Sequence, residues 1–434
     1  MEPTTLAIFG IAGMFALIIL RVPIGIAMCV AGLAGCAAII GRPAAMSFLS
    51  TEVMAKFSSP DTAVAPMFLL MGNLATISGL SGDLYRLAHV CVGHFRGGLA
   101  MATVAGCGFF GAICGSSAAT TATFTSVALP EMINRNYSKY LATGVIAAGG
   151  CLGTLVPPSV PLVLYAVMTG QFIVELFMAA FIPAMLCILL FFVTVWLICL
   201  VNPQAGPAGQ RRSAMEVLDA FKKSWAAILL LLGVLGGIYA GIFTVNEGAA
   251  VGCVLSLIFA VIRKAINRKT IGAIIKDTVV AMGMIYIIMI GAGIFGYFIA
   301  LSGIAQVTVD AITAAGMPNW LIITLLMFVY FIMGAIFDCL AAMLITLPLV
   351  VPIITGMGYS LVWWGIVNMV IINIGQISPP IGLNVFVLKS LSGYNLGLLY
   401  RGVAPFMLAA IALLAVLIAW PHVVLFLPTL LMGF

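Results

Sequence analysis

The sequence predicts an all-α polytopic membrane protein built from two inverted repeats, and three observations lead to this fold class. First, 64% of the 434 residues are hydrophobic and only 7% are charged, and the mean hydropathy is +1.27, which soluble domains do not reach. Second, apolar runs of membrane-spanning length recur along the whole chain. Third, Gly- and Pro-containing breaks interrupt corresponding runs in the two halves, and such breaks at membrane depth need protein or water beside them.

The first predicted repeat covers residues 1–201. An uncharged run carries a glycine, two serines and two threonines at its centre, so we expect a re-entrant helical hairpin over 97–133. The next run, 139–169, holds three prolines and a glycine near its middle and is predicted to be a broken span. Further spans are expected at about 4–20, 24–40, 63–80 and 176–201, with an interfacial helix at 44–58.

A polar stretch at 202–224 is the natural midpoint and is predicted to be a cytoplasmic linker. The second repeat, 225–434, continues in the same order, with a hairpin at 319–355 and a broken span at 361–392. Its other spans are expected at about 225–241, 247–262 and 279–301, and from about 402 to the C-terminus.

The two halves align at a fixed offset. Gly-Ala-Ile at 111 recurs at 334, and Pro157-Pro158 matches Pro379-Pro380, so the offsets are 334 − 111 = 223 and 379 − 157 = 222. Similarity at a constant offset indicates an internal repeat, although coincidence in a Gly- and Ala-rich chain is the alternative.

The positive-inside rule sets the predicted orientation. With the N-terminus outside, 16 of the 18 lysines and arginines lie on the cytoplasmic side. Five spans per half is an odd number, so the repeats enter the membrane from opposite faces and both termini are periplasmic. Inverted repeats with broken helices are typical of secondary transporters. We expect an elevator in which 97–169 and 319–392 slide against the remaining spans.

Other function classes are disfavoured by the sequence. No catalytic pairing, HExxH motif or phosphate-binding loop occurs, so the chain is not expected to be an enzyme or to use an organic cofactor. The charges lie in short loops without interleaved aromatic residues, so a nucleic-acid partner is not expected. Membrane lipid is the expected surrounding.

The tips and breaks carry hydroxyl, carboxylate and freed carbonyl oxygens, which are the ligands that small cations prefer. We expect two or more Na⁺ ions to couple transport. The candidate Na⁺ ligands are Ser116, Ser117, Thr120, Gly153, Val156 and Pro157 in the first half, and Gly334, Asp338, Gly375 and Ser378 in the second. The candidate substrate contacts are Thr121, Pro158 and Asn384.

Each candidate has a structural alternative. The first tip could be a tight turn packed by small residues between two ordinary spans. Asp338 is an ionisable group in an uncharged stretch, which by default indicates function, but it could instead cap the returning helix. Asn384 could form a helix–helix hydrogen bond. Glu247 is expected to cap the start of its span.

Several separated motifs resemble one known family, the DctM-like large membrane subunit of the tripartite ATP-independent periplasmic (TRAP) transporters. The similar stretches are Gly115-Ser116-Ser117-x-Ala119-Thr120, Pro130-Glu131-Met132 with Tyr137, Leu152-Gly153-x-Leu155-x-Pro157-Pro158-Ser159, Tyr239-Ala240-Gly241-Ile242-Phe243-Thr244 through Glu247, and Pro379-Pro380-x-Gly382-Leu383-Asn384. The chain departs from the family pattern at 244–248, where it reads Thr-Val-Asn-Glu-Gly instead of Thr-Pro-Thr-Glu-Ala.

The resemblance implies an elevator-type, Na⁺-driven importer of a small organic acid in the bacterial inner membrane. It implies two partners, a four-helix small membrane subunit and a periplasmic substrate-binding protein. No four-helix segment precedes the first span, so the small subunit is expected as a separate chain. A stand-alone Na⁺/dicarboxylate symporter of similar hairpin architecture is the alternative.

Overall fold

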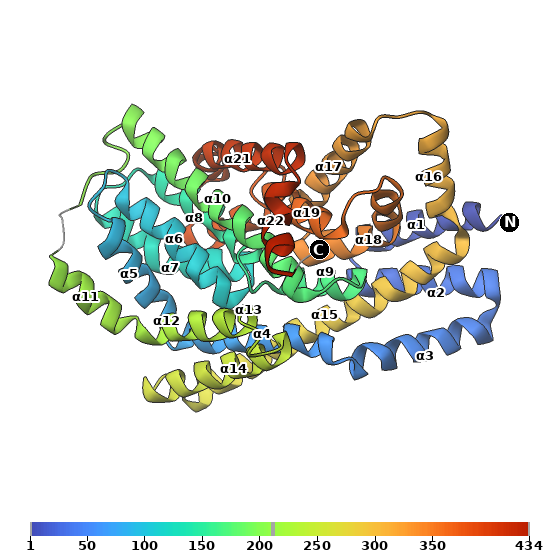
Figure 1. The fold of residues 1–434 in the computed structure, drawn as a ribbon, viewed down its shortest axis with the longest axis horizontal. Coiled ribbons are helices and arrows are strands. Elements are labelled where there is room, and N and C mark those ends of the chain that lie inside the picture. Colours follow the sequence, from blue (N-terminus) through green and yellow to red (C-terminus); the bar gives the residue numbers. More distant parts are fainter. Residues whose placement is uncertain (1, 210–212, 433–434) are drawn as a thin grey trace.

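The computed structural model describes residues 2–209 and 213–432, which are helical and contain no β-strand (Figure 1). The first half contains α1 (Pro3–Ile19), α2 (Ile24–Ile40), α3 (Arg42–Ser58), α4 (Pro60–Ile77), α5 (Leu80–Val92), α6 (Gly98–Cys114), α7 (Ser117–Asn134), α8 (Lys139–Leu155), α9 (Val160–Thr169) and α10 (Ile173–Val201).

The second half begins with α11 (Ala214–Lys223), α12 (Trp225–Leu231), the π-helical turn η1 (Leu232–Gly236), α13 (Gly237–Tyr239), α14 (Val245–Ile262) and α15 (Arg268–Ser302). It continues with α16 (Ile304–Ala314), α17 (Asn319–Ile336), α18 (Cys339–Gly356), α19 (Leu361–Gln376), α20 (Leu383–Ser392), α21 (Leu396–Ala419) and α22 (His422–Met432). In the described ranges, seven helices are long and apolar enough to cross a membrane, or nine if each bent pair counts as one span. The predicted polytopic helical fold is confirmed.

The last predicted span, from about 402 to the C-terminus, proves to be two helices, α21 and α22. Three further helices were not predicted. α5 follows α4 after a bend of 70°, and α16 follows α15 after Gly303, whose φ of +67° lies in the left-handed region. Figure 1 shows α5 at one end of the molecule and α16 at the opposite end. α11 lies inside the stretch that was predicted to be a plain polar linker. The expected span 279–301 proves too short, because α15 extends it by more than two turns through a charged N-terminal segment.

The packing divides the helices into two groups. α2 packs against α15, and α4 packs against α14, so each pair joins one helix from the first half to one helix from the second. The α2–α15 contact is close because glycine lines it: a methyl group on Gly25 would lie 2.5 Å from the carbonyl oxygen of Ile287. α6 and α7 pack against α8, and α17 and α18 pack against α19, to form the second group. α10 and α21 pack mainly against this second group, and the two groups also contact each other, α15 with α18 and α4 with α6 and α9.

The start of the linker is fastened to the loops at both ends of the α6–α7 pair. The N–H of Gly97 donates to the carbonyl of Gly206 at 3.0 Å, and the N–H of Ser138 donates to Ala205 at 2.9 Å. The hydroxyl of Tyr137 donates to the carbonyl of Pro207 at 2.9 Å. Burial raises the pKa of Tyr137, so this donor keeps its proton at neutral pH. Residues 205–207 therefore hold the base of the α6–α7 pair closed.

Glu247 caps its helix as expected. The Thr244 hydroxyl accepts from the Glu247 N–H, and the Glu247 carboxylate accepts from the Thr244 N–H. This reciprocal capping box fixes the start of α14 at Val245. The departure from the family pattern at 244–248 therefore leaves the helix start intact.

Candidate functional site

The first tip joins α6 to α7 through Gly115 and Ser116. Gly115 adopts φ +63°, a conformation that glycine reaches without steric cost. Ser116 is the N-cap of α7, and its hydroxyl accepts from the N–H of Ala119 at 3.4 Å. The Thr120 hydroxyl donates to the Ser116 carbonyl at 2.8 Å, and its lone pairs remain free to bind a cation.

The first tip lies directly against the first broken span. A methyl group on Gly111 would lie 2.7 Å from the Cα atom of Gly153, and one on Gly153 would lie 2.5 Å from both the Ser116 carbonyl oxygen and the Thr120 hydroxyl oxygen. Only hydrogen fits at these two positions. α8 ends at Leu155 and α9 begins at Val160, so the helix is open beside the tip. Val156, Pro157 and Pro158 lie in this opening and are buried.

The second half repeats this close contact. A methyl group on Gly334 would lie 2.5 Å from the carbonyl oxygen of Ile372, and one on Gly375 would lie 2.7 Å from the backbone nitrogen of Ala335. The Ala335 carbonyl accepts from the N–H of Gly382 at 3.0 Å, which ties α17 to the start of α20. The peptide bond between the two prolines is cis in both breaks. The glycines that were aligned by sequence offset thus make equivalent contacts.

Asp338 is placed differently from its neighbours. It is the N-cap of α18, and its carboxylate accepts from the N–H of Ala341 at 3.3 Å. The residue is exposed on the surface of the chain, and no hydrogen bond among the described residues joins it to Ser378. Ser378 is buried, and its hydroxyl donates to the carbonyl of Ile374 at 2.6 Å. The structure therefore brings Gly334, Gly375 and Ser378 together, while Asp338 caps its own helix.

Two side-chain hydrogen bonds join the halves at the centre of the site. The Ser117 hydroxyl donates to Oε1 of Gln376 at 2.9 Å. The Thr154 hydroxyl donates to Oδ1 of Asn373 at 2.8 Å. Within the described residues, Nε2 of Gln376 and Nδ2 of Asn373 are buried without a hydrogen-bond partner. Buried polar groups are normally paired, so these two amide donors are the unusual feature of the site.

Asn384 belongs to the same cluster. It is fully buried at the start of α20, and its Nδ2 donates to Sγ of Cys151 on α8 at 3.4 Å. Its Oδ1 has no hydrogen-bond partner among the described residues. Thr121, in contrast, donates to the Ser117 carbonyl of its own helix at 2.9 Å and packs against Gly150.

Sequence reasoning missed Thr154, Asn373 and Gln376. Gln376 and Asn373 lie within the predicted broken span 361–392, but neither was among the predicted Na⁺ ligands or substrate contacts. The available signal was the placement of two amides three residues apart in an uncharged run, because positions i and i+3 share a helix face. Polar side chains in membrane-spanning segments usually face the interior or a cavity.

The helix ends give the site a defined electrostatic pattern. α6 and α8 end there with carbonyls that have no partner within their own helix, and α7 and α9 begin there with N–H groups that have none. α17, α18, α19 and α20 repeat this arrangement in the second half. C-terminal ends favour cations and N-terminal ends favour anions, so the arrangement can hold cations and an anion side by side.

Comparison with known proteins decides the family. The family described as "Tripartite ATP-independent periplasmic transporter, DctM component" matches residues 11–423. The chain belongs to this family. It is therefore a large permease subunit of a TRAP transporter and a multi-pass membrane protein, and the resemblance seen in the sequence is confirmed. Its homologues are transporter subunits, in agreement with a non-enzymatic role.

Relatives of known role extend over most of this DctM-family chain. It is 33% identical to the C4-dicarboxylate TRAP transporter large permease protein DctM of Pseudomonas aeruginosa, over 84% of this chain and 85% of the relative. It is 26% identical to the sialic acid TRAP transporter large permease protein SiaM of Vibrio cholerae, over 98% and 99%. It is 29% identical to the isethionate TRAP transporter permease protein DctMQ of Oleidesulfovibrio alaskensis, over 95% of this chain and 65% of that longer protein.

Solved structures share the fold at low sequence identity. The Alcanivorax borkumensis YdaH transporter aligns with a TM-score of 0.62 at 12% identity, over 97% of this chain and 98% of that one. Neisseria gonorrhoeae MtrF aligns with a TM-score of 0.52 at 14% identity, over 96% and 95%. At these identities the likeness concerns the fold alone.

Proposed function

We propose that this DctM-family subunit imports a small organic carboxylate, driven by Na⁺, and that 1–201 and 225–434 act as inverted repeats around one central site. The observation that carries the proposal is the pair of equivalent contacts between tip and break, Gly111 with Gly153 and Gly334 with Gly375. The first contact includes the Ser116 carbonyl and the Thr120 hydroxyl, and the N–H of Ser378 bonds to the Gly375 carbonyl beside the second, which supports one cation site per half.

The first half supplies the more complete set of Na⁺ ligands. Ser116 and Thr120 contact Gly153, and we assign these two residues, Ser117 and the carbonyls of Gly153, Val156 and Pro157 to one Na⁺ site. In the second half, Gly334, Gly375 and Ser378 occupy the equivalent place. Asp338 would complete that set through Oδ2, because its bond to the N–H of Ala341 uses Oδ1.

A carboxylate fits between the two cation sites. The buried, unpartnered amide N–H groups of Asn373 and Gln376 are donors for its oxygens. The N-terminal ends of α7 and α18 favour negative charge. Lysine and arginine are absent from the hydrogen-bonded cluster of described residues that surrounds these amides, so bound Na⁺ is the counter-charge that remains. We assign Thr121 and Pro158 to the lining of this site, and Asn384 would contribute its unpartnered Oδ1.

Two partners follow from the tripartite family. A periplasmic binding protein would deliver the acid, and a small membrane subunit would complete the permease. The fusion in the isethionate relative, whose name combines M and Q, supports a small subunit beside this chain. The site would work in the bacterial inner membrane with both termini on the periplasmic side.

The packing supports an elevator, with one change to the expected moving unit. α10 and α21 pack mainly on α6, α8 and α19, so they belong with the moving unit instead of the scaffold. The scaffold is then α1–α4 and α12–α15, with α5 and α16 as connecting arms. The contact between the two groups includes an apolar pair, Phe68 of α4 and Phe177 of α10, with ring centroids 6.4 Å apart. An apolar contact can slide without leaving a polar group unpaired in lipid.

Transport in proteoliposomes tests Na⁺ coupling. The vesicles would contain this chain, its small subunit and the binding protein loaded with its acid. Ser117→Ala should abolish Na⁺-dependent uptake, because it removes a ligand and the bond to Gln376. Ser126→Ala is the matched control, since Ser126 is exposed and bonds within α7. Equal uptake by both variants would remove the proposed site. Uptake without the binding protein would favour the stand-alone symporter.

A cross-link tests the elevator. Cysteines in place of Phe68 and Phe177, bridged by a thiol cross-linker, should stop uptake, and cleavage of the bridge should restore it. The control bridge replaces Trp225 and Phe259, which are 5.4 Å apart and both within the scaffold. If uptake continues after the first bridge has formed, the elevator is refuted and local gating is the mechanism that remains.

Cysteine accessibility tests the inverted orientation. A membrane-impermeant thiol reagent should label cysteines placed at 95 and 136 from the cytoplasm, and those at 318 and 357 from the periplasm. These positions lie at the open ends of the α6–α7 and α17–α18 pairs. Labelling of both pairs from one side would contradict inverted repeats.

A further inference from the structure

The linker helix α11 is strongly amphipathic, and the proposed function does not explain why. Leu218 and Phe221 project from one face and are 50% and 46% exposed. Glu216, Asp219 and Lys223 lie on the opposite face, where Lys223 pairs with Asp219 at 2.7 Å. Positions three or four apart share a helix face, so the polar and apolar residues form separate stripes.

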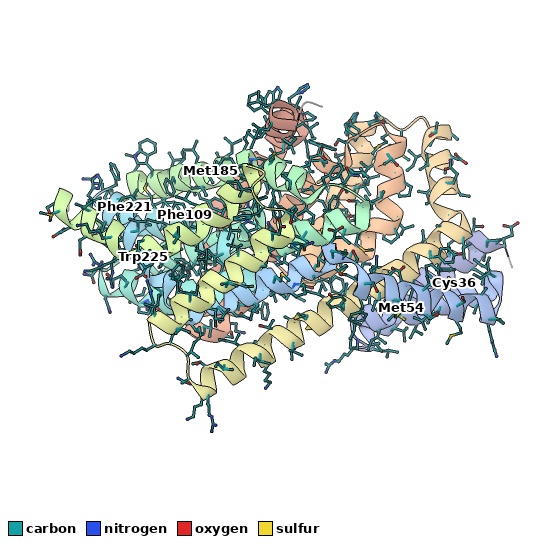
Figure 2. The ribbon with its side chains drawn as sticks, turned by 60° about the horizontal axis from the view of Figure 1, so that its bottom comes forward. Cys36, Met54, Phe109, Met185, Phe221 and Trp225 are labelled. Atoms are coloured by element: carbon teal, nitrogen blue, oxygen red, sulfur yellow. The ribbon has the colours of Figure 1, made fainter. Side chains whose placement is uncertain are left out.

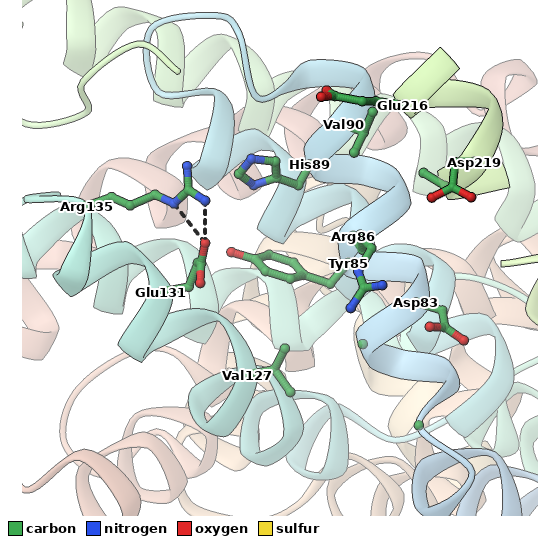
Figure 3. A pocket seen from close by; sticks show the side chains of 13 residues that line it. Asp83, Tyr85, Arg86, His89, Val90, Val127, Glu131, Arg135, Glu216 and Asp219 are labelled. Carbon is green, nitrogen blue, oxygen red and sulfur yellow. Dashed lines mark hydrogen bonds and ion pairs between the residues drawn. The ribbon is translucent and has the colours of Figure 1, made fainter. Parts of the chain in front are cut away.

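The polar face of α11 turns toward a cavity in the protein. A cavity of about 620 Å³ lies between α5, α7 and α11, and Glu216, Asp219 and Ala220 are the residues that line it from α11. Figure 3 shows these two carboxylates across the cavity from Glu131 and Arg135, which form an ion pair at 2.7 Å. With its polar side occupied in this way, the apolar stripe of α11 faces outward.

The apolar stripe continues into a membrane span. Met215, Leu218, Phe221, Trp225, Leu229 and Leu232 follow one another at intervals of three or four residues, and each is at least 45% exposed. Trp225 begins α12, which is bent by 60° from α11. Figure 2 shows Phe221 and Trp225 on the outside of the ribbon. α12 belongs to a candidate span, so we expect its exposed outer face to meet lipid tails, and the stripe continues from it across the bend onto α11.

The charges near this stripe fit a negatively charged surface. Lys222 flanks the apolar face, and Lys223 ends the helix on the polar face, where it pairs with Asp219. Tryptophan and lysine at the end of a span are typical of the membrane–water boundary. Lysines at such a boundary are attracted by anionic lipid headgroups.

We propose that α11 is an interfacial helix that lies on the cytoplasmic leaflet, with its apolar stripe among the acyl chains and its lysines at anionic headgroups. The helix then forms one wall of the cavity. Because it also packs on the connecting arm α5, it fixes this arm relative to the membrane surface. This inference rests on the orientation given in the proposed function, and it does not depend on Na⁺ coupling or on the identity of the substrate.

Spin labels on the full chain test this placement. Cysteines would replace Leu218 and Phe221 on the apolar face and Glu216 and Asp219 on the polar face, in a background where the exposed Cys91 is serine. The chain would be reconstituted with and without its small subunit in vesicles of phosphatidylcholine mixed with phosphatidylglycerol. Labels on the apolar face should be accessible to oxygen and protected from a water-soluble nickel chelate, and labels on the polar face should show the reverse.

Every other pattern overturns the proposal. Nickel access on both faces would place α11 in water. Protection of the apolar face from both reagents only when the small subunit is present would make that subunit the occupant. Dipolar broadening between labels at 218 would indicate a second copy of the chain.

The lysines are tested in the same vesicles. Lys222→Gln with Lys223→Gln should reduce the depth of the label at 218 in vesicles with phosphatidylglycerol, and should have little effect in pure phosphatidylcholine. An attraction of the usual size corresponds to about a five-fold change in the inserted fraction per lysine. An equal shift in both lipids would rule out headgroup recognition.

Discussion

The hydrogen bond between Ser117 and Gln376 offers a direct measurement of how the two halves are joined. Oγ of Ser117 lies 2.9 Å from Oε1 of Gln376, and the residues are 4% and 1% exposed. Ser117→Ala leaves the amide oxygen buried without a donor, and Gln376→Met leaves the hydroxyl without an acceptor. Each single substitution should therefore lower the free energy of unfolding by about 1–3 kcal/mol.

The double variant should lose less than the sum, because it leaves neither unpaired partner. Interhelical hydrogen bonds in membrane proteins give interaction energies of about 0.6 kcal/mol on average and about 1.7 kcal/mol at most. A double-mutant cycle on reversible unfolding of the full chain in detergent measures this quantity. Ser126→Ala combined with Gln376→Met is the matched control, since Ser126 bonds to Ala122 of its own helix. An interaction energy below about 0.3 kcal/mol, as expected for independent sites, would refute a direct link.

Gly153→Ala should lower the free energy of unfolding by about 1–3 kcal/mol because its methyl group overlaps the first tip, whereas Gly13→Ala, which has nothing within 4 Å, should not; thermal unfolding in detergent compares the two. Asp83→Asn should speed hydrogen exchange in the first turn of α5, because Asp83 pairs with Arg263, the C-cap of α14, at 2.5 Å. Removal of such a partly exposed pair should cost about 1 kcal/mol. Exchange that is unchanged from a Lys264→Ala control would show that the pair does not hold the arm.

Helix positions could be predicted wherever the sequence contains its own stop signals. Gly115 and Ser116 end one helix and cap the next, and the prolines at 157 and 158 prevent α8 from continuing. The broken spans therefore begin and end within a residue of the expected ranges. Such local signals depend on backbone conformation and not on distant contacts.

Elements that depend on their surroundings could not be predicted in the same way. α5, α11 and α16 are short and mix polar with apolar residues, so hydropathy alone does not separate them from loops. The charged start of α15 was excluded by the same criterion, although Asn267 caps it with a capping box. Side-chain partners are harder still, because the Ser117–Gln376 bond joins residues 259 positions apart.

The hydrogen bonds at the centre show that the two halves are not equivalent in chemistry. Both hydroxyl donors, Ser117 and Thr154, come from the first half, and both amide acceptors, Asn373 and Gln376, come from the second. Each bond uses the amide oxygen, so each amide nitrogen is left over as a buried donor. Under the proposed function, the first half would supply oxygen ligands to a cation, and the second would present N–H groups to a carboxylate. Loss of either half's contribution should then weaken the binding of both ligands.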